Sequence, residues 1–168
     1  IDQPAFVGGI GDEIEPFAFD FTGYQVLLVN PREYISTEDI FTLGDRFGFD
    51  NVDSKKIRKS IQKNNTDEFI KNIHNALQPI AVNNNKRVKE TYEHIKNELG
   101  EEGLTMTGSG STFIKIIKAG DEQAQAFVTN NKDKYFTNIY NFLFNRKLHL
   151  ENGNKEKVEK AHESRLGY

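Results

Sequence analysis

The chain has 168 residues, a formal net charge of -3 at pH 7 and a hydrophobic content of 36%. This weakly acidic balance gives no broad positive field, so we expect no nucleic-acid partner. The sequence has no cysteine, which excludes disulfides and thiolate metal sites and is typical of a cytoplasmic protein. No apolar run approaches the roughly 20 residues that span a bilayer, so we expect no membrane partner.

The aromatic content favours one globular domain. The 13 Phe and 6 Tyr supply bulky core material to a chain whose mean hydropathy is -0.65. The chain begins Ile1-Asp2-Gln3, and its one methionine is Met106. Processing, or origin as a fragment of a longer protein, would each explain that start.

The first half of the chain is predicted to hold a turn, a strand and several helices. Residues 8–11 form a glycine-rich turn, and the apolar run 24–29, bounded by Gly23 and Asn30-Pro31, predicts a buried strand. Helices are expected from a cap at Ser36 or Thr37 through Phe41, at 54–62, at 67–77 with Thr66 as a cap, and at 86–99 closing at Gly100.

The second half is predicted to hold a hairpin, a helix and a last strand. Strands at 104–107 and 112–118 flank Gly108-Ser109-Gly110, a helix opens at Gly120-Asp121, and residues 135–148 are rich in strand-forming types. The order strand, helices, strand, strand, helix, strand predicts an α+β fold. It is that of a ferredoxin-like βαββαβ sandwich with extra helices in the first crossover.

The loop Gly108 to Ser111 is the first candidate site. Glycines between two strands allow positive φ and close backbone approach, so N–H groups and the hydroxyls of Ser109, Ser111 and Thr112 could bind a phosphate oxygen. Taken alone, the pattern favours a plain hairpin turn. It is no P-loop, because the lysine that should follow the last glycine is missing and Lys115 lies within the strand.

Three further patterns have structural alternatives. Gly9 and Gly11 fit a turn or the border of a ligand channel, and without a third spaced glycine they exclude a dinucleotide fingerprint. Ser36-Thr37-Glu38 fits a helix cap that could also contact a ligand, and Asn75 to Pro79 fits a helix end. The four histidines show no metal-ligand spacing, and no nucleophile–base pair can be argued, so we expect no metal site and no catalytic residue in this chain.

Four segments nevertheless occur together in a fixed order. They are Ala5-Phe6-Val7-Gly8-Gly9-Ile10-Gly11-Asp12, then Leu27 to Pro31 with Ile35-Ser36-Thr37-Glu38-Asp39-Ile40-Phe41, then Asn75-Ala76-Leu77-Gln78, and last Met106-Thr107-Gly108-Ser109-Gly110-Ser111-Thr112. Over about residues 4–150 this combination resembles the 4-diphosphocytidyl-2-C-methyl-D-erythritol kinases of the GHMP kinase superfamily. The last segment is common to the superfamily, and Ile35-Ser36-Thr37 points to this member.

The resemblance implies the function of a parent enzyme. It would use ATP and Mg²⁺ to phosphorylate the 2-hydroxyl of its sugar substrate, a step in non-mevalonate isoprenoid synthesis. It assigns support of the ATP phosphate loop to Gly108, Ser109, Gly110 and Ser111. It assigns substrate contact to Thr37, near the methylerythritol phosphate region, and the border of the same cleft to Gly9 and Gly11.

Some family features are missing. Asp12 replaces a usual Glu, Ala76 replaces a frequent Asp, and the charged tail 151–168 has no counterpart. The catalytic lysine, phosphate loop and aspartate belong to an N-terminal domain that is absent from the chain. We therefore expect residues 1–150 to be a GHMP kinase C-terminal domain followed by a charged extension, inactive alone and partnered by the missing N-terminal kinase domain.

Two alternatives stay open at this point. A different GHMP kinase, such as a homoserine or mevalonate kinase, would share the Gly-Ser-Gly loop, although we do not associate Ile35-Ser36-Thr37 with those enzymes. A free-standing ferredoxin-like binding or regulatory module would fit the missing catalytic residues. A gene that continues upstream into a glycine-rich phosphate loop would decide for the kinase.

Overall fold

The structure is a computed structural model that describes residues 4–50 and 54–142. The chain divides into two compact units, one formed by Gly23–Phe142 and one that contains Ile1–Thr22. Each unit is described by itself below. The predicted tail 151–168 and the predicted strand residues 143–148 lie outside the described residues.

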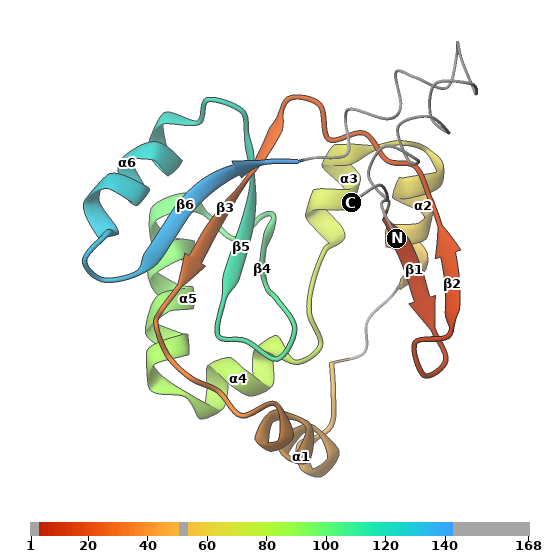
Figure 1. Cartoon of the computed structure of the whole chain (residues 1–168), viewed down its shortest axis with the longest axis horizontal. Coiled ribbons are helices and arrows are strands. Elements are labelled where there is room, and N and C mark those ends of the chain that lie inside the picture. The colour runs from red at the N-terminus through yellow and green to blue at the C-terminus, as the bar shows by residue number, and fades with distance from the viewer. Residues whose placement is uncertain (1–3, 51–53, 143–168) are drawn as a thin grey trace, which may run out of the picture. The chain divides into compact units, whose positions relative to one another are not determined.

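The larger unit is built on a four-stranded antiparallel sheet. Its strands are β3 (Tyr24–Asn30), β4 (Leu104–Met106), β5 (Phe113–Lys118) and β6 (Phe136–Asn141). Their order in the sheet is β4-β5-β3-β6, and all neighbours are antiparallel (Figure 1). This is the order of a ferredoxin-like sandwich, so the predicted fold is confirmed.

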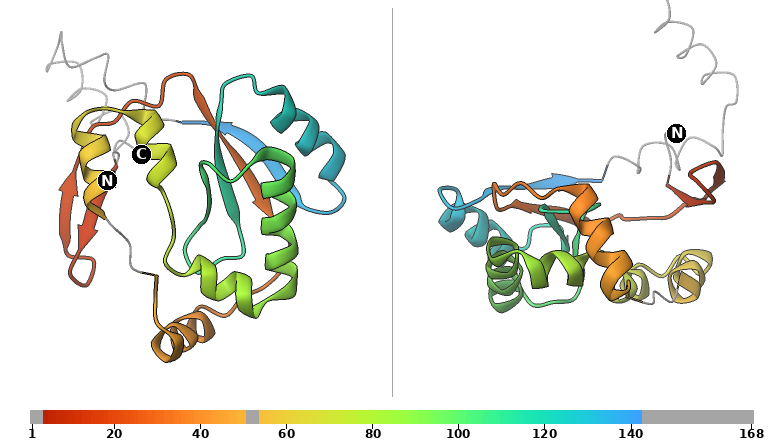
Figure 2. Two further views of the ribbon diagram at one scale, coloured as in Figure 1. Left: turned by 180° about the vertical axis from the view of Figure 1, so that it is seen from behind. Right: turned by 90° about the horizontal axis from the view of Figure 1, so that it is seen from below.

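Six helices of the described chain connect these strands. The first crossover holds α1 (Thr37–Phe47), α2 (Ser54–Gln62), α3 (Thr66–Asn72), α4 (Gln78–Asn84) and α5 (Lys86–Leu99), and the second holds α6 (Glu122–Asn131). In the right-hand view of Figure 2, α4, α5 and α6 lie on the same side of the four-stranded sheet. The extra helices therefore belong to the first crossover, as predicted.

The core lies between the sheet and these helices. Leu27 and Val29 alternate with less buried neighbours along β3, as expected for a strand with one face on the core. They pack in one cluster with Val88 and Ile95 of α5 and with Phe127 of α6. The apolar run that predicted a buried strand therefore supplies the centre of the domain.

The segment between α3 and α5 differs from the prediction. Asn65, not Thr66, caps α3 by accepting a hydrogen bond from the Glu68 N–H. The helix ends at Asn72 instead of Leu77, and a separate helix, α4, begins at Gln78. Pro79 lies in the first turn of α4, where the missing N–H of proline costs no hydrogen bond. Pro79 therefore lies in the first turn of a helix and not after the end of one.

The smaller unit contains a two-stranded hairpin. β1 (Ala5–Gly8) pairs with β2 (Glu13–Pro16) in antiparallel register. The predicted glycine turn joins them, with φ of 59° at Gly9 and 97° at Gly11. Asp12 Oδ1 accepts a hydrogen bond from the Ile10 N–H at 3.1 Å, which holds the turn from within. Across the whole described chain, no helix combines the length and apolar character that a membrane crossing requires.

Candidate functional site

The loop from Thr107 to Ser111 closes as a tight turn between β4 and β5. The Thr107 N–H donates to the Thr112 carbonyl at 2.8 Å, and the Gly110 N–H donates to the Thr107 carbonyl at 3.0 Å. Gly108 has a φ of 53° and Gly110 one of 98°, values that disfavour other residues. The turn that the sequence predicts is therefore present, and its glycines are needed for its backbone.

Gly110 is also required by its surroundings. A Cβ atom at this position would lie 2.8 Å from Met106 Sδ and 3.2 Å from Ile35 Cδ1. Around Gly108, by contrast, nothing lies within 4 Å of such an atom. Gly110 thus fits against β4 and the segment before α1, whereas Gly108 is exposed.

The start of α1 contacts the loop through a pair of hydroxyls. Ser36 caps the helix by accepting a hydrogen bond from the Asp39 N–H at 3.2 Å. The next residue, Thr37, places its hydroxyl oxygen 2.8 Å from that of Ser109. The structure therefore brings together two residues that the sequence assigned to separate tasks, Thr37 to substrate and Ser109 to the phosphate loop.

The end of β3 holds the other side of the loop. The Ser111 hydroxyl is buried and donates to the Glu33 carbonyl at 2.5 Å. The Thr112 hydroxyl accepts a hydrogen bond from the Asn30 amide at 2.7 Å. Of the three hydroxyls considered for a phosphate, that of Ser109 is the one on the accessible side, and Ser111 acts by fixing the loop.

The segment between α3 and α4 provides a third set of contacts. The Asn75 amide donates to the carbonyls of Met106 at 2.8 Å and Gly108 at 2.7 Å, and Gln78 Oε1 accepts from the Met106 N–H at 2.8 Å. The sequence interpretation of Asn75 as part of a helix end missed this contact. Only the Asn75-to-Gln78 resemblance hinted at it, because the contacts span about 30 residues of sequence.

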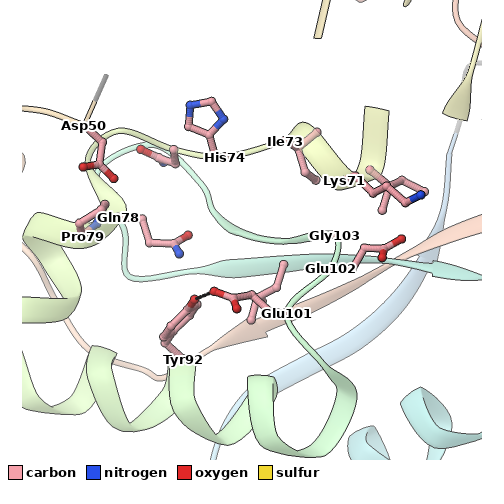
Figure 3. Close-up of a pocket in the computed structure, with 13 residues that line it drawn as sticks. Asp50, Lys71, Ile73, His74, Gln78, Pro79, Tyr92, Glu101, Glu102 and Gly103 are labelled. Atoms are coloured by element: carbon pink, nitrogen blue, oxygen red, sulfur yellow. Dashed lines mark hydrogen bonds between the residues drawn. The ribbon is translucent and has the colours of Figure 1, made fainter. Parts of the chain in front are cut away.

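An open pocket of about 440 Å³ lies beside this segment (Figure 3). Asn75 and Gln78 line it together with charged residues that include Lys71, Glu101 and Glu102. The Tyr92 hydroxyl donates to Glu101 at 2.5 Å and Lys96 lies 2.9 Å from it. Both partners lower the pKa of the Glu101 carboxyl, Tyr92 the more strongly. The Glu101 carboxylate is thus paired with both Tyr92 and Lys96, so it is not a free base.

Lys115 is buried inside the domain. Its ammonium group donates to the carbonyls of Gly100 at 3.0 Å and Glu102 at 2.5 Å, and burial lowers its pKa. Gly100 ends α5, where unpaired carbonyls attract a cation. Lys115 therefore stabilises a helix end and is not available to a phosphate group.

The described residues contain no cluster of metal-binding side chains. None of the His, Asp and Glu side chains in residues 4–50 and 54–142 form a group of three that could hold one. These described residues therefore offer no site for Mg²⁺ that is built wholly from such side chains.

Gly9 and Gly11 lie in the hairpin unit, apart from the unit that carries the loop. Each has a local reason to be glycine, because both have positive φ and a Cβ atom at Gly9 would lie 2.4 Å from Asp12 Oδ1. Within the larger unit, the structure brings Thr37 to the loop that holds Ser109 and Ser111. Their role at a cleft stays a prediction.

Comparison with known protein families bears directly on this loop and its supports. Residues 57–134 match the family model described as GHMP kinases C terminal. This stretch includes the Asn75 segment, the glycine-rich loop and the strands on both sides of it. These residues are therefore similar to the C-terminal domain of GHMP kinases.

Curated relatives and a solved structure agree with this similarity. A 4-diphosphocytidyl-2-C-methyl-D-erythritol kinase of Clostridium tetani is 31% identical over 135 residues, covering 78% of this chain and 46% of the relative. One of Mesorhizobium japonicum is 26% identical, covering 80% and 45%. A crystal structure of 4-(cytidine 5'-diphospho)-2C-methyl-D-erythritol kinase shares the fold, with a TM-score of 0.59 at 19% identity over 81% of this chain and 48% of that one. The chain spans less than half the length of these proteins.

Proposed function

We propose that this GHMP domain is the C-terminal, substrate-side part of an ATP-dependent kinase. Its substrate would be 4-diphosphocytidyl-2-C-methyl-D-erythritol, phosphorylated at the 2-hydroxyl in non-mevalonate isoprenoid biosynthesis. The observation that carries the proposal is the hydrogen bond between Thr37 and Ser109, because it joins the segment typical of this kinase to the loop typical of the superfamily. The names of the matching relatives support the same substrate.

The loop would take the phosphate side of the reaction. Among described residues, none accepts a hydrogen bond from the backbone N–H of Gly108 or Ser109. Free N–H groups beside a hydroxyl suit an anionic oxygen, and phosphoryl transfer depends on such positioning and charge stabilisation. Gly110 and Ser111 would fix the loop from its buried side, Gly110 by packing closely against Met106 and Ser111 by its hydrogen bond to the Glu33 carbonyl.

The start of α1 would take the sugar side. Glu38 and Asp39 are exposed in its first turn, and their negative charge offsets the positive helix end. The neutral hydroxyl of Thr37 suits a hydrogen bond to a polar group of the substrate. The same helix face carries Phe41, four residues further along and 48% exposed. An exposed aromatic ring is suited to stacking on a planar ring such as a nucleobase.

The remaining parts would belong to the parent protein. ATP, Mg²⁺ and the catalytic residues would be held mainly by an N-terminal kinase domain, with Gly9 and Gly11 at the border of the cleft. Residues 1–150 would form the C-terminal domain and 151–168 a charged extension. A small-molecule substrate and a cytoplasmic location complete the proposal.

A substrate panel tests the proposal. The full-length parent kinase is incubated with ATP and, in turn, with the diphosphocytidyl methylerythritol, homoserine and mevalonate, and ADP release is measured. We expect turnover with the first substrate alone. Turnover with homoserine or mevalonate would assign the domain to another GHMP kinase, and no turnover with any of them would contradict the kinase itself. The 168-residue chain alone should release no ADP.

Thr37 provides the residue-level test. We expect Thr37→Ala to raise the KM for the sugar substrate about 2- to 13-fold, the range for one lost hydrogen bond, with little change in the KM for ATP. Thr37→Ser keeps the hydroxyl and serves as the matched control, with KM values near wild type. An unchanged sugar KM in Thr37→Ala would remove Thr37 from the substrate site.

A further inference from the structure

Asn75 lies in the non-helical segment between α3 and α4 and uses its carboxamide fully. Its Nδ2 donates two hydrogen bonds, to the carbonyls of Met106 and Gly108. Its Oδ1 accepts the Leu77 N–H at 2.8 Å. The acceptor bond to a backbone N–H fixes which end of the amide is oxygen, so both N–H donors must face the loop.

The bond to Gly108 determines where the next N–H group points. A peptide unit is planar, and in its trans form the carbonyl and the following N–H point in opposite directions. Holding the Gly108 carbonyl toward Asn75 therefore directs the Ser109 N–H away from Asn75. That N–H has no acceptor among the described residues. It belongs to the residue whose hydroxyl meets Thr37, so Asn75 orients a free donor at the proposed phosphate surface.

Gln78 makes a useful contrast. It lies in the first turn of α4 and accepts the Met106 N–H, so it holds strand β4 without reaching the loop. Asn75 bonds both to the strand end at Met106 and to the loop at Gly108. The contact that reaches the glycine-rich loop from this segment is thus the one made by Asn75.

We infer that Asn75 is a positioning residue for the glycine-rich loop, holding the Gly108–Ser109 peptide so that its N–H faces the phosphate of ATP. The inference rests on the proposed kinase function and adds to it a residue that contacts neither substrate. Because Asn75 acts through backbone carbonyls of the loop, its loss should weaken the interaction with the phosphate of ATP and leave the contact at Thr37 unchanged.

The substitution Asn75→Asp in the full-length kinase separates this role from others. Aspartate keeps the size and the acceptor for the Leu77 N–H, but it replaces two donors by a charged acceptor facing two carbonyl oxygens. We expect the KM for ATP to rise about 10- to 100-fold, while the KM for the sugar substrate stays within about twofold of wild type. Asn75→Ala should show the same pattern to a smaller degree, because it removes the donors without adding charge.

Asn84→Asp is the matched control. Asn84 also donates its amide to a carbonyl, that of Ile80 at 2.8 Å, but within α4 and away from the loop. We expect this variant to keep both kinetic constants for ATP within about twofold. A merely structural role of Asn75 would lower the amount of active enzyme and the apparent kcat, with both KM values unchanged. That result would overturn the inference, as would an equal loss in Asn84→Asp.

A second measurement avoids dependence on folding of the variants. In the wild-type kinase, the Ser109 amide resonance is followed by NMR during titration with a non-hydrolysable ATP analogue. A shift is expected, and an unmoved Ser109 resonance would overturn the inference. The outcomes stay distinguishable from failure of the proposed function, because in that case the wild-type protein itself shows no ATP-dependent phosphorylation of the sugar substrate.

Discussion

The turn at the tip of the β1–β2 hairpin and the loop between β4 and β5 share one local design. Each joins two antiparallel strands and has glycines two residues apart. The φ values are 59° and 97° at Gly9 and Gly11, and 53° and 98° at Gly108 and Gly110. By backbone conformation at these positions, the two turns are nearly the same.

Their contacts are very different. The hairpin turn is held by its own neighbour Asp12, and Ile10 at its tip is 97% exposed. The loop is held by Thr37, Glu33 and Asn75, which lie 72, 78 and 33 residues away from their partners in the sequence. The comparison teaches that glycine composition decides the turn, while contacts from distant segments make one of the two turns a candidate site.

The largest expected effect tests the difference directly. Gly110→Val in the full-length kinase should cost about 3 kcal/mol of unfolding free energy and most of the turnover, because it combines an unfavourable φ with overlap at Met106. Gly11→Val has the same φ but open space around it, so only about 1–2 kcal/mol should be lost. Urea unfolding and turnover measure both. Equal losses would break the comparison, and near-normal turnover in Gly110→Val would remove Gly110 from the mechanism.

A middle-sized effect is expected at the two serines. Ser111→Ala removes a buried hydrogen bond and leaves the Glu33 carbonyl without its donor, which should cost about 1–2 kcal/mol. Ser109→Ala removes a bond between accessible hydroxyls, so its cost in stability should be about 0.5 kcal/mol or less. For kcat/KM for ATP the order of the two variants should reverse: Ser109→Ala should lower it more than Ser111→Ala does. A larger catalytic loss in Ser111→Ala would contradict the assignment of the phosphate side to Ser109.

The smallest effect is expected in the hairpin. Asp12→Ala removes an exposed side-chain bond to the Ile10 N–H and should cost about 0.5 kcal/mol in urea unfolding. The kinetic constants for ATP should not change, because nothing in this contact reaches the loop. A clear rise in the KM for ATP would show that the hairpin turn acts on the phosphate side and not only at the border of the cleft.

Features with local causes could be predicted from the sequence. Strand β3 was predicted because an apolar run lies between Gly23 and Asn30, and α5 because its pattern closes at Gly100. The turn at Gly108 is predicted from its local sequence, because glycines lie between two strand-forming runs. These features depend on residues within a few positions of one another.

Features that depend on contacts between residues far apart in the sequence could not be predicted from it. Asn75 was interpreted as a helix end, since nothing nearby in the sequence reveals that its amide meets Met106 and Gly108. The sequence named Ser111 as a possible phosphate contact, but it cannot show that the side chain turns inward to Glu33. The segment Asn75 to Pro79 fits a helix end in the sequence, whereas in the structure Pro79 lies in the first turn of α4.

The 440 Å³ pocket of Figure 3 has a consequence for inhibition, because Asn75 lines it and also holds the loop. A small molecule bound there with an acceptor for the Asn75 amide would compete with the Gly108 carbonyl for that donor. It would disturb the loop while leaving the binding places of both substrates open. Such a compound would raise the apparent KM for ATP without occupying the place of ATP, as loss of the Asn75 amide is expected to do, and would leave the KM for the sugar substrate unchanged, which is allosteric inhibition.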